Sequence, residues 1–202
     1  MYDARQIANE FIQRGLDDQR PLSPLHIQKL VYFAHARHLA LHKEPLIFQE
    51  FRAWQYGPVV RDLYDDLKSY GKRRVTQTIP LADERQAQIE DHGTIDWSYR
   101  SFGHLDTFLV VSLTHEPKGP WERARKSGKA ISNDSIREYY AEPWIAENKT
   151  LLDRVSRHPE IVADFLQSQK EFEEGRFFSA SSPEEMLEQI EQRREERDAE
   201  GA

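Results

Sequence analysis

Three histidines in one stretch of the sequence are the residues best placed for metal chemistry. His35, His38 and His42 stand at i, i+3 and i+7, so they would project from one side of a helix. Such a group of imidazoles could bind zinc or nickel. However, no acidic residue sits at helical spacing among them to orient a ring, and their face merges with an apolar one. Packed or surface histidines are the favoured interpretation, and we expect no metal site.

The pair His115-Glu116 is a second candidate for chemistry, as an acid–base couple in a rigid loop. A loop histidine that is hydrogen-bonded to the backbone explains the pair equally well. The carboxylates of Asp62, Asp65 and Asp66 are typical of a solvated helix stripe. The sequence contains no GxSxG, HExxH, P-loop or GxGxxG motif. We therefore expect neither catalysis nor a bound cofactor.

The charge is unevenly distributed along the chain. Residues 1–149 carry 21 Lys+Arg and 21 Asp+Glu, whereas residues 150–202 carry 7 and 14, so the formal charge of −7 lies in the last quarter. The basic clusters Lys72-Arg73-Arg74 and Arg123–Lys129 could contact phosphate, but affinity for nucleic acid requires a surplus of cations. Nucleic acid is thus an unlikely partner, and an acidic end on a neutral body favours a basic protein partner.

The composition is that of a globular protein with a highly charged surface. The chain has 202 residues, of which 38% are hydrophobic and 31% are charged. No apolar run approaches the roughly 20 residues that a membrane helix requires. The absence of cysteine excludes disulfides and a thiol nucleophile. We expect a cytoplasmic protein with no membrane partner.

Helical periodicity dominates residues 1–142 and predicts a mainly α, compact domain with a small β-sheet or hairpin. The alternation over Ile47–Trp54 predicts the strand, and the Tyr56-Gly57-Pro58 turn should start the following helix. Between residues 72 and 104, Val75–Ile79 could be a strand, Asp83–Asp91 a helix and Thr94–Tyr99 either. The predicted helices span Asp3–Leu16, Pro24–Leu41, Val59–Tyr70, Leu105–Leu113, 120–125 and Ser135–Tyr140.

Four segments of the chain carry a specific pattern. They are LHIQKLVYFA at residues 25–34, AWQYGPV at 53–59, LTHE at 113–116 followed by Pro120-Trp121, and the stretch from Ile131 to Tyr140. In this order they resemble the motifs of the Panacea-domain family, the SocA-like and GepA-like antitoxins of bacterial toxin–antitoxin systems. The resemblance covers residues 1 to about 142 and leaves residues 143–202 outside it.

The resemblance implies a mainly helical domain that acts as an antitoxin and not as an enzyme, often encoded by prophages or plasmids. Such proteins neutralise a cognate protein toxin by direct contact, so a hetero-oligomer with the toxin is the implied assembly. Two alternatives stay open: a DNA-binding autoregulator of its own operon, using Arg123–Lys129, or an adaptor that delivers the toxin to a protease. Lys29 and Tyr56 are the candidates for a contact surface. The other motif residues should hold the fold: Gln28, Tyr32, Trp54, Gly57, Pro58 and Trp121.

Residues 143–202 are expected to form a helical, acidic extension that provides toxin specificity. Ser182-Pro183-Glu184-Glu185 is a capping box with proline at the first helical position. The apolar stripe that follows is too narrow to stabilise an isolated helix, so it should be buried against a partner. The predicted anchors are Phe172, Phe177, Phe178, Met186, Leu187 and Ile190, with Glu184, Glu185, Glu188 and Glu191 facing a basic patch.

Overall fold

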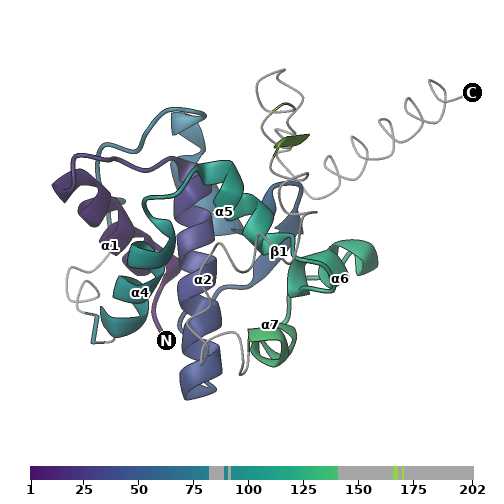
Figure 1. Cartoon of the computed structure of the whole chain (residues 1–202). Coiled ribbons are helices and arrows are strands. Elements are labelled where there is room, and N and C mark those ends of the chain that lie inside the picture. The colour runs from purple at the N-terminus through teal and green to yellow at the C-terminus, as the bar shows by residue number, and fades with distance from the viewer. Residues whose placement is uncertain (82–88, 91, 141–165, 168–169, 171–202) are drawn as a thin grey trace, which may run out of the picture. The chain divides into compact units, whose positions relative to one another are not determined.

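The computed structural model describes residues 1–81, 89–90, 92–140, 166–167 and 170 (Figure 1). The elements belong to one compact unit within Met1–Leu166. The described residues form a mainly α fold with one small sheet, as predicted. In chain order the elements are α1 (Ala4–Asp17), α2 (Pro24–His42), β1 (Phe51–Trp54), β2 (Gly57–Val60), α3 (Arg61–Leu67), the 3-10 helix η1 (Lys68–Tyr70), α4 (His92–Phe102), α5 (Thr107–Thr114), α6 (Pro120–Ser127) and α7 (Asn133–Tyr140).

Helix α2 is the element against which most others pack (Figure 1). The Ser23 side chain caps it by accepting the His26 N–H, Pro24 occupies its first turn, and Lys43 ends it in the left-handed region at φ 62°. Because α1, α3, α4, α5, α7 and β2 all contact α2, its polar side chains are buried together with its apolar ones. The helix is therefore buried on more than one face, and its polar residues must find partners inside the body.

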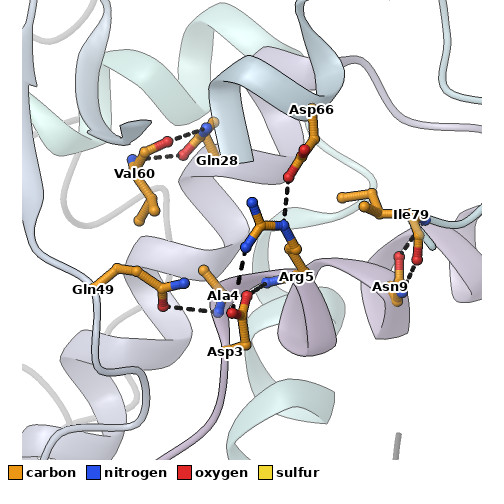
Figure 2. Close-up of polar contacts among 9 residues, drawn as sticks. All are labelled: Asp3, Ala4, Arg5, Asn9, Gln28, Gln49, Val60, Asp66 and Ile79. Atoms are coloured by element: carbon orange, nitrogen blue, oxygen red, sulfur yellow. Dashed lines mark hydrogen bonds and ion pairs between the residues drawn. The ribbon is translucent and has the colours of Figure 1, made fainter. Parts of the chain in front are cut away.

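Polar contacts fix α1 to segments far away in the sequence (Figure 2). Asp3 and Gln6 form a capping box at the start of α1. The Arg5 guanidinium binds the Asp66 carboxylate at 2.6 Å, and Asn9 exchanges two hydrogen bonds with the backbone of Ile79. These contacts tie α1 to α3 and to the segment after η1.

The sheet is an antiparallel hairpin in which Trp54 pairs with Gly57, so Gln55 and Tyr56 make a two-residue turn. The predicted strand over Ile47–Trp54 is shortened to its second half, and Ile47 instead forms an isolated bridge with Tyr2. No membrane-spanning helix, by length and hydropathy, occurs among the described residues.

The prediction that Pro58 starts a helix is wrong, because Pro58 lies in β2 and α3 begins only at Arg61. The Gln28 side chain explains the difference: its amide accepts the Val60 N–H at 2.9 Å and donates to the Val60 carbonyl at 3.1 Å (Figure 2). A side chain of α2 thus pairs with Val60 as a neighbouring strand would, which keeps Val60 extended.

The remaining predictions fall into three groups. The helix predictions near α1, α2, α5, α6 and α7 are confirmed, and Thr94–Tyr99 is part of α4. Val75–Ile79 is not a strand, because the Val75 and Ile79 N–H groups bind the Leu22 carbonyl and the Asn9 side chain instead of a ladder. The helix predicted over Asp83–Asp91 and the domain boundary at 142/143 lie outside the described residues.

Candidate functional site

Lys29 is completely buried, so the expectation that it forms part of a contact surface is wrong. Its Nζ donates to the Pro58 carbonyl at 2.7 Å, directly beneath the hairpin. Burial lowers the pKa of Lys29 well below its usual value, because a charged ammonium would be desolvated there. Lys29 therefore supports the hairpin from inside.

Gly57 completes this support. Its φ of 93° is a conformation that favours glycine, and a Cβ at this position would overlap Thr114 Oγ1 and lie 3.0 Å from Lys29 Cε. The hairpin, α2 and the end of α5 therefore approach one another as closely as the absence of a side chain allows. We call Lys29, Gly57, Pro58 and Thr114 the hairpin knot.

The other motif residues also lie in packed positions. Gln28 and Tyr32 are buried, and the Tyr32 ring packs edge to face against Tyr140, with ring centroids 6.1 Å apart, in an aromatic cluster around α2. The Trp121 indole Nε1 donates to the Trp54 carbonyl at 2.8 Å, which fastens α6 to β1. Each motif residue thus connects α2, the hairpin or α6 to another part of the body.

Half-buried aromatic side chains from different elements contact the hairpin at and beside its turn. Trp54 meets Tyr64 of α3 with ring centroids 4.8 Å apart, and Tyr56 meets Phe108 of α5 at 6.4 Å. We call Trp54, Tyr56, Tyr64, Phe108 and Trp121 the hairpin surface.

Cations flank this surface. Arg61 lies over the Trp54 ring at 5.9 Å and Arg125 lies over the Trp121 ring at 5.4 Å. Half-exposed Trp and Tyr side chains combined with Arg are the residues that contribute most to protein interfaces. The sequence singled out Tyr56, Trp54 and Trp121, but not Tyr64 and Phe108, which join them only through the tertiary fold.

The histidines do not form the sites that their spacing suggested. His35 is turned into the core, where its Nε2 binds Asn133 Oδ1 at 2.9 Å and its Nδ1 accepts the Ile47 N–H at 3.4 Å. Burial lowers the pKa of His35 to about 4. His38 and His42 instead pack ring to ring with centroids 4.5 Å apart. No cluster of three His, Cys, Asp or Glu residues suited to a metal ion occurs in the described part of the chain.

His115 and Glu116 contact different neighbours. The His115 ring stacks on Trp121 with centroids 3.6 Å apart. The Glu116 carboxylate, which is 4% exposed, accepts the Tyr139 hydroxyl at 2.8 Å. Both residues therefore join the α5–α6 loop to neighbouring elements.

The basic cluster of α6 and the acidic extension complete the list of predicted sites. Arg123, Arg125 and Lys126 are exposed, and Lys126 pairs with Glu122 at 2.6 Å. The positions of the extension lie outside the described residues: Phe172, Phe177, Phe178, Met186, Leu187, Ile190, Glu184, Glu185, Glu188 and Glu191.

Comparisons with known proteins find a related antitoxin family. Residues 27–122 match the family described as Antitoxin SocA-like, Panacea domain. The chain is 28% identical to Antitoxin SocA of Caulobacter vibrioides (strain NA1000 / CB15N) over 129 residues, which cover 59% of this chain and 69% of that protein. No solved structure matches the chain. The matched segment contains the hairpin knot and the hairpin surface, and over this segment the chain is similar to the SocA-like, Panacea-domain antitoxins.

Proposed function

We propose that this protein is a cytoplasmic, non-enzymatic antitoxin that neutralises a cognate protein toxin by binding it directly through the hairpin surface. The observation that carries the proposal is the group of five half-buried aromatic side chains around the hairpin turn, within the segment that matches the antitoxin family. Residues 143–202 add affinity for a toxin with a basic surface, through their acidic side chains and apolar anchors.

Rigidity of the support favours this role for the hairpin surface. The two-residue turn is held from below by Lys29, from the side by the Trp121 indole, and at Val60 by Gln28. An interface whose aromatic groups are already in place loses little conformational entropy on binding. The cations Arg61 and Arg125 add attraction for acidic groups at the edge of a partner's contact region.

Replacing Tyr56 by alanine is expected to weaken toxin binding by about 30-fold, because truncating a central aromatic anchor costs about 2 kcal/mol. The toxin to use is the product of a neighbouring reading frame that is lethal when expressed alone, and the dissociation constant is measured by calorimetry. Phe48→Ala is the matched control, since Phe48 is 60% exposed and lies outside the hairpin surface. Equal affinities for the two variants would exclude the hairpin surface as the binding site, and a parallel fall in melting temperature would assign Tyr56 a structural role.

Deleting residues 175–202 is expected to abolish neutralisation while the body stays folded, because the deletion removes most of the predicted anchors. Growth of cells that co-express the toxin reports neutralisation, and thermal unfolding reports the fold. A shorter deletion of residues 195–202, which leaves every anchor in place, should still rescue growth. If the longer deletion also rescues growth, the extension has no role in toxin recognition.

A further inference from the structure

A cavity of about 470 Å³ lies where the α1–α2 loop, the segment after η1 and the α4–α5 loop meet. It shares no residue with the hairpin surface. Two guanidinium groups line it: Arg20 precedes α2, and Arg74 follows η1. The Val75 N–H donates to the Leu22 carbonyl at 2.8 Å, which fixes the backbone beside Arg74 against the loop that carries Arg20. Two cations distant in the sequence are thus held at one cavity.

The two arginines differ in how they are held. The Arg20 guanidinium is oriented by His104: Nη2 donates to the His104 carbonyl at 3.3 Å and Nη1 lies 3.3 Å from its Nδ1. Arg74 is exposed, and no described side chain forms a hydrogen bond or ion pair with it. The cavity therefore contains one oriented cation and one whose charge is not neutralised within the described part of the chain.

His26 forms a neutral wall of the cavity. Its Nε2 lies 3.1 Å from the Phe102 carbonyl, which can only accept, so Nε2 carries the proton and Nδ1 accepts the Thr107 hydroxyl at 3.1 Å. Burial lowers the pKa of His26 to about 4, and the nearby charges of Arg74 and Arg20 act in the same direction. The one acidic side chain of the lining, Asp106, caps α5 by accepting the Phe108 N–H at 2.8 Å.

We propose that this cavity binds a phosphate monoester, with the phosphate between Arg20 and Arg74. Guanidinium groups offer paired N–H donors that match phosphate oxygens, and two of them outweigh the single carboxylate of Asp106. The volume is within the range of about 300–1,000 Å³ that small-molecule sites occupy. Leu22 and Leu105 provide an apolar wall for the organic part of the ligand. The protein would then have two binding partners: the toxin proposed above and a small phosphorylated molecule.

The test is an NMR titration of the full-length protein, at constant ionic strength, with inorganic phosphate, AMP and adenosine. Phosphate and AMP should cause saturable amide shifts at Gly103–Thr107, and adenosine should cause none. Arg74→Gln should weaken AMP binding about tenfold, the loss expected for a charge-assisted hydrogen-bond pair. Arg100→Gln is the matched control, because Arg100 is an exposed residue of α4 that does not line the cavity.

Several results would overturn the proposal: no saturation at millimolar phosphate, equal binding of adenosine and AMP, or equal affinities of the Arg74 and Arg100 variants. An oligonucleotide with a terminal phosphate, compared with the same strand ending in hydroxyl, identifies the source of the ligand. Preference for the phosphorylated end supports a monoester at the terminus of a nucleic acid, and preference for AMP over either strand supports a free nucleotide. Equal binding of both strands would show recognition of backbone diesters and contradict the proposal.

Discussion

Replacing Gly57 by alanine is expected to lower the free energy of unfolding by about 3 kcal/mol, the combined effect of a strained backbone and an overpacked contact. The φ of 93° disfavours any side chain, and the added Cβ would meet Thr114 Oγ1 and Lys29 Cε in the hairpin knot. Both neighbours are buried, so neither can move aside without loss of packing. Urea denaturation monitored by tryptophan fluorescence measures the effect.

Gly71→Ala is the control that separates the cost of backbone strain from the cost of the overpacked contact. Gly71 also has a positive φ, of 55°, but no atom lies within 4 Å of the Cβ position. This control should lose only the backbone part, about 1 kcal/mol. The double variant Gly57→Ala/Thr114→Ala should recover part of the loss, because it removes the nearest hydroxyl. If Gly57→Ala and Gly71→Ala are equally destabilised, the hairpin knot is not closely packed.

The helices could be predicted from local signals because those signals lie next to the segments they control. Ser23 and Pro24 start α2, and the capping box of Asp3 and Gln6 starts α1. Proline at residue 58 is an equally good local signal for a helix start, yet it lies in a strand. The pairing of Val60 with Gln28, a side chain 32 positions away in the sequence, outweighs it.

The candidate site could be predicted only in part, for the same physical reason. Tyr56 stands beside a turn and was identified from that position, whereas Phe108 reaches the hairpin surface from α5. As a residue of the first motif, Lys29 is a candidate for a contact surface, but its ammonium group has a backbone acceptor inside the body. The sequence groups Arg74 only with its neighbours Lys72 and Arg73, as a basic cluster. The contact between Val75 and Leu22 brings Arg74 to the cavity that Arg20 also lines.

Lowering the pH from about 6.5 to about 4.5 is expected to destabilise the body through His35 and His26, by up to about 2.5 kcal/mol for each. Burial holds the pKa of both at about 4, compared with an ordinary value of 6.5. Above pH 6.5 both histidines are neutral in the folded and the unfolded chain, so their full contribution to stability is present. As the pH falls, the unfolded chain binds protons first and stability is lost, until the folded form also titrates near pH 4.

His35→Gln tests this expectation, because glutamine does not titrate in this range. Its free energy of unfolding, measured by urea denaturation across the pH series, should depend on pH about half as strongly as that of the wild type, even if the variant is less stable throughout. His42→Gln is the control, since His42 is exposed at the end of α2. The carboxylates of Asp65 and Glu122 should add little to the pH dependence of stability above pH 4.5, because hydrogen bonds to basic groups lower their pKa values. An identical pH dependence of the two variants would mean that His35 is not held neutral in the core. The hydrogen bond between His35 and Asn133 would then stabilise the charged imidazolium ring.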